Sequence, residues 1–273
     1  GFNSVFLVLL FLLGCTLFLS VWFGAEEITS SEIFSSVRKY FSGSEDMTLI
    51  ERIFLEIRLP RALLCVFVGA SLAVGGVLMQ ALFRNPIVEP GLIGTSSGAA
   101  FGAALYFVLR ALFEFNGGEW TLPIAACAGG ILSTFLVIAL AHSKQTGKSS
   151  VVTLLLTGIA INALFLSGVG FLSYIARDPQ ARSITFWNLG TLSGANWHSV
   201  LIIGSSTGMC FFIGLRYAKQ LNALILGETE AQLLGVNVKS LKVKVLLVNV
   251  ILVAIATAFV GVISFVGLIV PHL

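Results

Sequence analysis

Long apolar stretches without charge alternate with short polar segments along the whole chain. Seven of these stretches are long enough to span a membrane and contain no Asp, Glu, Lys or Arg. They are Ser4–Ala25, Ala62–Phe83, Pro90–Leu109, Trp120–Ser143, Ser149–Ala176, His198–Leu215 and Val245–Leu273. About 20 residues of helix cross a bilayer core, and lipid offers no partner to a free backbone N–H or C=O. Each stretch is therefore predicted to be a helix, and the fold class all-α.

Composition supports a membrane protein. The chain of 273 residues is 57% hydrophobic and 11% charged, with a mean hydropathy of +0.99, whereas soluble domains are roughly 25% charged. This excludes a soluble enzyme, and the dispersed net charge of +3 excludes a nucleic-acid partner. Because no sustained alternation typical of barrel strands is present, we expect one polytopic membrane domain over residues 1–273 with lipid around it.

The first stretch has two alternative interpretations. Ser4–Ala25 could be a signal peptide, and Leu12–Cys15 resembles a lipoprotein cleavage box. However, its apolar run is longer than that of a signal peptide and continues to Phe23. A first transmembrane helix is therefore favoured. The absent initiator Met and the apolar last residues suggest a chain trimmed at both ends and incomplete at its C-terminus.

The distribution of basic residues gives a weak indication of orientation. If the N-terminus is cytoplasmic, the inner and outer loops carry equal numbers of Lys and Arg. Most of the outer ones lie in the long loop 26–61, and long loops cross the membrane largely regardless of charge. An N-inside orientation is the expectation. The polar segment Ser30–Met47 is then external and is expected to form short helices or a surface loop.

The sequence contains no recognisable catalytic, metal-binding or nucleotide-binding motif. The four cysteines lie singly in different apolar stretches, which supports neither disulfides nor a zinc site. Thr146–Ser149 resembles the end of a phosphate-binding loop, but the required glycine is replaced by His142. No catalytic residue, metal site or cofactor is expected, which counts against a membrane enzyme. Any energy for transport must come from a partner or an ion gradient.

Prolines interrupt the chain between the second and third stretches. Pro86, Glu89 and Pro90 predict a rigid non-helical turn. Such a loop at membrane depth is either buried in protein or lines an aqueous cavity, although an ordinary turn between helices remains possible. Gly94, Gly98 and Gly102 follow at helical spacing and predict close packing with a neighbouring helix.

A weak repeat links two distant stretches. Gly76-Val77-Leu78 stands ten residues before Pro86, and Gly261-Val262-Ile263 stands ten before Pro271. The two stretches run in opposite directions across the membrane, as in inverted-topology repeats, whose interface usually carries the transport path. Coincidence is the alternative interpretation.

The loop Leu221–Val238 is predicted to be cytoplasmic. Within it, Glu228–Leu234 is expected to form a short helix with acids in its first turn, which suits the helix dipole. Gly227 and Gly235 are expected to end it. The helix should expose Ala231 and Leu234 to the cytoplasm, where a partner could bind.

Four ordered motifs resemble the FecCD-type permeases, the membrane subunits of ATP-binding-cassette importers for iron–siderophores, haem and cobalamin. They are Arg58-Leu59-Pro60-Arg61, Gly75–Gln80 leading into Arg84–Gly91, the loop Leu221–Val238, and Phe265–His272. The resemblance implies a type II importer bundle, with ten spans in the family against seven here. It also implies a homodimer or an equivalent pair, cytoplasmic ATPase subunits, a periplasmic substrate-binding protein and the bacterial cytoplasmic membrane.

The resemblance also assigns roles to residues. Arg58 and Arg61 match outer arginines that dock a binding protein; the alternative is plain membrane-edge arginines. Asn85 and Ile87 match a loop at the cytoplasmic constriction, and Ser167 lies near the matching gate. The ATPase-coupling helix is matched by Gly227, Glu228, Thr229, Ala231, Leu234 and Gly235.

The segment Ala181–Gly190 suggests the cargo, because it resembles the branch of this permease family that transports haem. Phe186 and Trp187 could line a path for a planar macrocycle or belong to an aromatic belt. We rank haem first, a ferric siderophore second and cobalamin third. A secondary transporter driven by an ion gradient is the rival, but it predicts buried ionisable residues within the spans, and the seven stretches contain no Asp, Glu, Lys or Arg.

Overall fold

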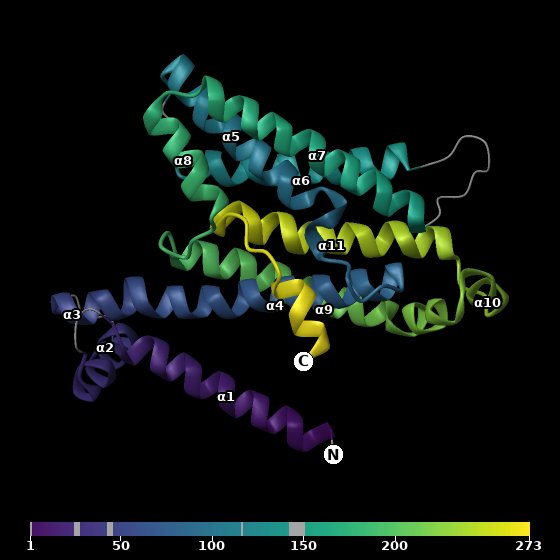
Figure 1. Cartoon of the computed structure of the whole chain (residues 1–273). Helices are drawn as coiled ribbons and strands as arrows, with labels where there is room; N and C mark the ends of the chain where they lie inside the picture. The colour runs from purple at the N-terminus through teal and green to yellow at the C-terminus, as the bar shows by residue number, and fades with distance from the viewer. Residues whose placement is uncertain (1, 25–27, 43–45, 116, 142–150) are drawn as a thin grey trace. The chain divides into compact units, whose positions relative to one another are not determined.

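The computed structural model describes residues 2–24, 28–42, 46–115, 117–141 and 151–273. All regular structure in these ranges is helical (Figure 1). The α-helices are α1 (Phe2–Trp22), α2 (Ser30–Ser42), α3 (Leu49–Arg52), α4 (Leu59–Phe83), α5 (Thr95–Phe113), α6 (Thr121–Leu140), α7 (Val151–Ile175), α8 (Asp178–Asn188), α9 (Trp197–Leu226), α10 (Glu228–Leu233), α11 (Val238–Val260) and α12 (Val266–Ile269). A π-helical turn, η1 (Ile53–Arg58), and two 3₁₀ turns, η2 (Pro90–Ile93) and η3 (Val270–His272), complete the elements.

Seven helical segments in the described ranges are long and apolar enough to cross a membrane. This confirms the all-α prediction and its number of spans. The expected polar helix after the first span is α2, and the expected turn between the second and third spans lies at Arg84–Glu89. The predicted limits at Ala25, Ser143 and Ser149 lie outside the described residues.

The last predicted span is wrong in its second half. Helix α11 ends at Val260, and Gly261 then adopts a φ of +75° that a helix does not allow. Residues 261–264 are not helical, and only the short α12 and η3 follow. The apolar run Val260–Val270 hid this break because it contains no proline or charge before Pro271.

Two further limits differ because charged residues continue a helix. Helix α9 runs to Leu226, through Arg216 and Lys219, so the first third of the predicted loop Leu221–Val238 is helical. Helix α11 starts at Val238 and includes Lys239, Lys242 and Lys244. Both helices are therefore longer than their charge-free stretches.

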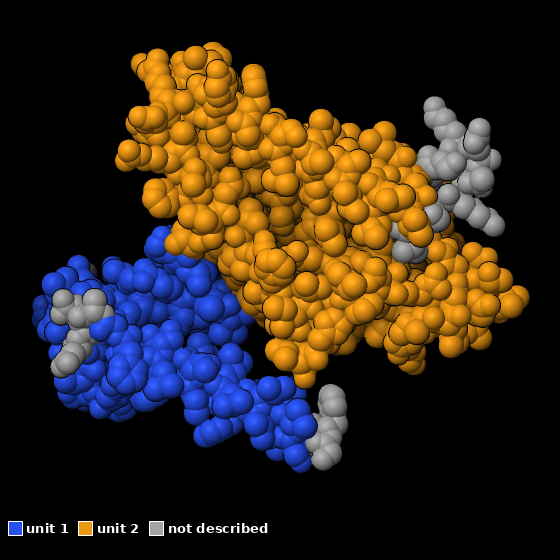
Figure 2. Space-filling view, in the orientation of Figure 1, with its two compact units in different colours: residues 1–67, 192–202 blue, residues 68–191, 203–273 orange. Residues whose placement is uncertain are grey.

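The chain divides into two compact units, which Figure 2 shows in blue and orange. The smaller unit comprises residues 1–67 and 192–202. In it, the buried Glu51 carboxylate accepts bonds from the Ser35 hydroxyl and the Lys39 ammonium, the latter at 2.9 Å. The Trp197 indole donates to the carbonyl of Leu55 at 3.0 Å. These bonds join α2 and the start of α9 to the segment before α4.

The larger unit comprises residues 68–191 and 203–273. Helix α5 contacts α6, α7, α8 and α11. A Cβ added at Gly98 would strike the carbonyl of Gly129, and one at Gly102 would strike the carbonyl of Ala125. The predicted close approach is therefore confirmed, and it joins α5 to α6.

The two segments of the weak repeat differ in local structure. Gly76–Leu78 lies inside α4, whereas Gly261–Ile263 follows the end of α11. A Cβ at Gly76 would strike the carbonyl of Gly267, so α4 packs directly against α12. The shared pattern does not mark matching positions in two helices.

Candidate functional site

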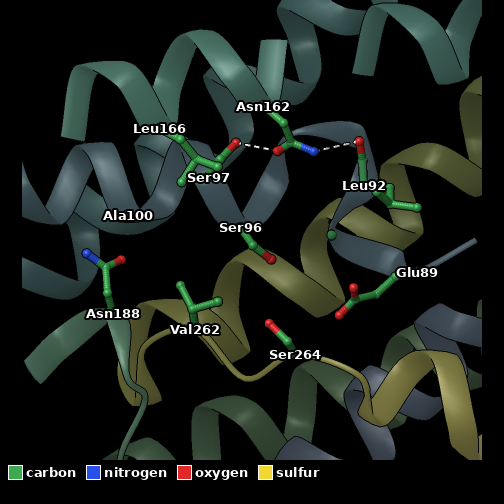
Figure 3. A pocket seen from close by; sticks show the side chains of 11 residues that line it. Glu89, Leu92, Ser96, Ser97, Ala100, Asn162, Leu166, Asn188, Val262 and Ser264 are labelled. Atoms are coloured by element: carbon green, nitrogen blue, oxygen red, sulfur yellow. Dashed lines mark hydrogen bonds between the residues drawn. The ribbon is translucent and has the colours of Figure 1, made fainter. Parts of the chain in front are cut away.

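A cavity of about 430 Å³ opens in the larger unit. Its wall combines residues of η2, α5 and α7 with the end of α8 and the non-helical residues after α11 (Figure 3). The polar lining residues are Glu89, Ser96, Ser97, Asn162, Asn188 and Ser264. Leu92, Ala100, Leu166 and Val262 supply an apolar part of the wall. The cavity therefore offers hydrogen-bonding groups and one carboxylate beside apolar surface.

Asn162 organises one side of the cavity. Its side-chain N–H donates to the carbonyl of Leu92 at 2.9 Å, and its oxygen accepts from the Ser97 hydroxyl at 2.5 Å (Figure 3). Ser97 also approaches the carbonyl of Gly94 at 3.0 Å. Since Leu92 belongs to η2, Asn162 fastens α7 to the turn that precedes α5. An amide within an apolar span is unusual, and a bonding role of this kind explains it.

Glu89 fastens the opposite side. Its carboxylate accepts the backbone N–H of Phe265 at 2.9 Å. Phe265 has a φ of +69°, a left-handed conformation that costs free energy in a residue with a Cβ. His272 approaches the carbonyl of Pro86 at 2.9 Å. The segment after α11 is thus held against the proline-containing loop predicted from the sequence.

Two glycines allow α8 to approach the end of α11. Gly190 and Gly261 have φ values of +69° and +75°. A Cβ at Gly190 would meet the carbonyl of Val262, and one at Gly261 would strike the carbonyl of Trp187. The side chain of Trp187 packs with the apolar core, whereas Phe186 is 67% exposed. The two aromatic residues singled out in the sequence thus have different surroundings.

The predicted gate residues lie outside the lining of this cavity. Asn85 accepts the backbone N–H of Ile87 at 3.0 Å, which stabilises the loop, and Ile87 itself is exposed. Ser167 lies on an exposed face of α7 and donates to the carbonyl of Ala163 at 2.8 Å. The cavity instead contains Leu166 and Asn162 from the same helix.

The expected short helix is α10, one residue shorter than predicted. Gly227 precedes it with a φ of +142°, and Gly235 follows with a φ of +83°. Leu233 and Leu234 are exposed. The prediction that Ala231 is exposed is wrong: it is fully buried in the core formed with α9 and α11. Its small side chain allows α10 to lie close to these helices.

An ion pair connects α10 to α11. The Lys242 ammonium lies 2.8 and 2.9 Å from the two carboxylate oxygens of Glu228. The Lys242 side chain is 6% exposed and that of Glu228 is 32% exposed. The sequence does not predict this pair, because the predicted span begins three residues after Lys242. Glu228 thus has a structural partner in addition to its favourable position at the start of a helix.

Arg58 and Arg61 have different environments in the smaller unit. The Arg58 guanidinium donates to the carbonyls of Val21 and Trp22, both at 3.1 Å. It thereby satisfies acceptors that the end of α1 leaves open. Arg61 is exposed. Arg58 therefore has a structural role, which is to bond to the carbonyls at the end of α1. The sequence motif around Arg58 does not predict this role.

The sequence does not predict most of the polar wall. Ser96, Ser97 and Ser264 carry no pattern, but Asn162 is an amide within an apolar span, which is a recognisable signal. Asn249, which lies outside the cavity lining, is another such amide. Asn249 is fully buried in α11 and donates to the carbonyl of Pro90 at 3.1 Å. Among the described residues, no group of three His, Cys, Asp or Glu side chains could hold a metal ion.

Comparison with known proteins agrees with the fold. The family model of the FecCD transport family matches residues 9–273. Over 221 residues the chain is 43% identical to the hemin transport system permease protein HmuU of Yersinia pestis, covering 81% of this chain and 65% of that protein. Over 222 residues it is 38% identical to the cobalamin import system permease protein BtuC of Halobacterium salinarum, covering 79% and 56%.

A solved structure is similar over nearly the whole chain. It is described as an inward-facing conformation of a metal-chelate type ABC transporter, and it matches with a TM-score of 0.84 and 31% sequence identity. The match covers 99% of this chain and 80% of that one. The chain spans less than two thirds of the length of the two permeases above.

Proposed function

Because the chain belongs to the FecCD transport family, we propose that it is the permease subunit of an ATP-driven importer for an iron chelate in the bacterial cytoplasmic membrane. It works with a second permease copy, cytoplasmic ATP-binding subunits and a periplasmic substrate-binding protein. The permease provides an alternating-access path, and the ATPase provides the energy. The names of the similar permeases and of the similar structure support this proposal.

The observation that carries the proposal is the exposed surface of α10, which faces away from α9 and α11. Leu233 and Leu234 are 84% and 65% exposed at one end of a helix whose opposite side is buried through Ala231. Exposed neighbouring leucines on a folded, polar segment are suited to bind a protein partner. In this proposal the partner is the ATPase subunit, and the residues from Gly227 to Gly235 form its docking element. The short helix gives that subunit a defined shape to bind.

The test is a double substitution that leaves the core intact. Leu233→Glu with Leu234→Glu, in the full-length protein expressed with its ATPase subunits, should abolish their co-purification and ATP-dependent uptake into proteoliposomes. Leu189→Glu is the matched control, since Leu189 is exposed on the same unit but far along the chain. Normal assembly of the double variant would refute the docking role. Uptake by the permease alone, driven by an ion gradient, would favour the rival transporter.

The outer docking role is proposed mainly for Arg61. Its exposed guanidinium is available to an acidic patch on a binding protein, and such charge pairs favour orientation and association rate. Arg61→Glu should slow association of the binding protein, measured by surface plasmon resonance. Arg58→Glu should instead lower the stability of the permease, because Arg58 bonds to the end of α1. Equal effects of both substitutions on association alone would contradict this division.

The translocation path is proposed to include the cavity beside Asn162 and Glu89. Its mixed polar and apolar wall suits a cargo that carries both polar groups and an organic ring system. Asn85, Ile87 and Ser167 remain proposed gate residues at another level of the path. Asn162→Leu should reduce uptake without preventing ATPase docking.

Haem is the proposed cargo, with a ferric siderophore and cobalamin as alternatives. The 43% identity to a hemin permease supports haem as the first choice. The 38% identity to a cobalamin permease does not support placing a ferric siderophore above cobalamin. Competition between haemin, a ferric siderophore and cobalamin for uptake by the reconstituted full complex distinguishes the three. Uptake of cobalamin with no uptake of haemin would overturn the ranking.

A further inference from the structure

The direction of α10 is not fixed by its own backbone. The helix has six residues, and an isolated helix of this length is not stable in water. Gly227 and Gly235 flank it in conformations that favour glycine. Contacts between its side chains and neighbouring helices must therefore fix its direction.

We propose that the Glu228–Lys242 ion pair makes α10 and α11 move as one body, so that force applied to Leu233 and Leu234 is transmitted along α11. This inference rests on the proposed function, in which an ATPase binds α10. Glu228 and Lys242 are positioning residues, since neither is proposed to touch the cargo. Ala231 provides the second contact point, buried beside α9 and α11.

The physical properties of the pair suit positioning more than stability. An ion pair with one buried partner contributes little net stability, because the buried charge loses hydration, but removing Glu228 leaves the buried Lys242 ammonium uncompensated. Both carboxylate oxygens of Glu228 are within 2.9 Å of the ammonium. An apolar contact at Ala231 alone would let α10 rotate about it. The bonds from Lys242 to both carboxylate oxygens of Glu228 fix the direction of α10 relative to α11, which apolar packing alone does not.

Helix α11 leads from this pair to the wall of the cavity. Asn249 lies seven residues after Lys242, about 10 Å along the helix, and donates to the carbonyl of Pro90. The Ser71 hydroxyl donates to the carbonyl of Leu252 at 3.0 Å. Pro90 begins η2, whose next residues, Gly91 and Leu92, line the cavity. A displacement of α11 therefore moves part of that wall.

The first experiment measures the connection itself. Nitroxide labels at Gln232 and Leu247, both exposed, report the distance between α10 and α11 in nanodiscs. Because Gln232 lies within the proposed docking element, the labelled protein is measured as a full complex only after it has co-purified with its ATPase subunits. Before and after addition of a non-hydrolysable ATP analogue, the parent protein should give one narrow distribution. Lys242→Met should widen it at least twofold, and the exposed Lys244→Met should not. An equally narrow distribution in Lys242→Met would overturn the inference.

The second experiment measures coupling. Lys242→Met should retain its ATPase subunits but lower the cargo taken up per ATP hydrolysed at least tenfold, whereas Lys242→Arg should recover most of it. If Lys242→Met does not fold, Glu228→Gln is measured instead, because Glu228 is partly exposed and its loss is milder. An unchanged ratio in the folded variant overturns the inference. If the parent complex takes up no cargo with ATP, the proposed function fails, and the distance measurement still decides whether the helices move together.

Discussion

Helices α1 and α11 are nearly equal in hydropathy but opposite in burial. The span in α1 has a mean hydropathy of 2.6, and none of it is buried within the chain. The span in α11 has a mean hydropathy of 2.5, and 67% of it is buried. Lipid and protein interior are both apolar, so hydropathy predicts that a helix crosses the membrane but not what it contacts.

The polar residues within the two helices differ in the same way. Helix α11 contains Lys242, Asn249 and Thr257, all buried, and the first two bond to other segments. Helix α1 contains Thr16, whose hydroxyl bonds only to the carbonyl of Leu13 in the same helix. A polar group in an apolar helix that bonds to another segment marks a packed face, since the group otherwise lacks a partner in lipid.

The largest expected effect is a loss of folded protein when a glycine in a packed helix, but not one in an exposed helix, is replaced by leucine. Gly98→Leu should prevent the close approach of α5 and α6, because its side chain would occupy the position of the Gly129 backbone. Gly14→Leu in α1 should be tolerated, since nothing lies within 4 Å of a Cβ there. The measurement is the yield of monodisperse protein in detergent by size-exclusion chromatography. Equal yields would contradict the distinction between the two helices.

An intermediate effect is expected for truncated leucines. Leu252→Ala in α11 should lower the free energy of unfolding by about 2 to 5 kcal/mol, because a fully buried side chain leaves a cavity. Leu10→Ala in α1 should change it by less than about 0.5 kcal/mol, as for other exposed sites. Unfolding in mixed micelles, followed by tryptophan fluorescence, measures both. A large effect at Leu10 would indicate that α1 is packed against protein in the assembled transporter.

The smallest effect concerns a hydrogen-bonded turn near α1, at the start of α2. The Thr29 backbone N–H and hydroxyl donate to the Glu32 carboxylate at 2.8 and 2.7 Å and hold the pKa of that carboxyl below its usual range. The stabilisation is present above the ordinary pKa of about 4.3 and is lost as the pH falls through the lowered value. In an NMR titration, the Thr29 amide and the Glu32 carboxyl should share one lowered midpoint.

The control for this titration is Thr29→Ala, which keeps the backbone donor and removes the hydroxyl. It should raise the midpoint of Glu32 part of the way towards the ordinary value. An amide shift at position 29 that is independent of Glu32 would contradict the bonded turn.

The sequence predicted the spans well because their physical cause is local. Seven apolar runs give seven helices. Pro86 follows the end of α4 and Pro90 begins η2, and proline restricts the backbone at both positions whatever surrounds it. The end of α11 is not predicted, because it depends on Gly261, which has a positive φ and lies against the carbonyl of Trp187 in α8, distant in sequence. A charge-free run cannot reveal such a break.

The candidate site was only partly predictable for the same reason. The limits of α10 follow from Gly227 and Gly235, whose conformational freedom is a property of the residue. The burial of Ala231 depends on how α10 meets α9 and α11, and that arrangement has no local signal. The bonds of Arg58 and Lys242 likewise join segments that periodicity treats separately.

The glycine contact between α5 and α6 has a consequence for biogenesis. The two helices are consecutive, and their closest approach is made by Gly98 and Gly102 of α5 with Gly129 and the backbone of α6. Such a hairpin can pair in the bilayer as soon as both helices have left the translocon, before later helices are synthesised. It would then serve as the template on which α7 and α11 assemble.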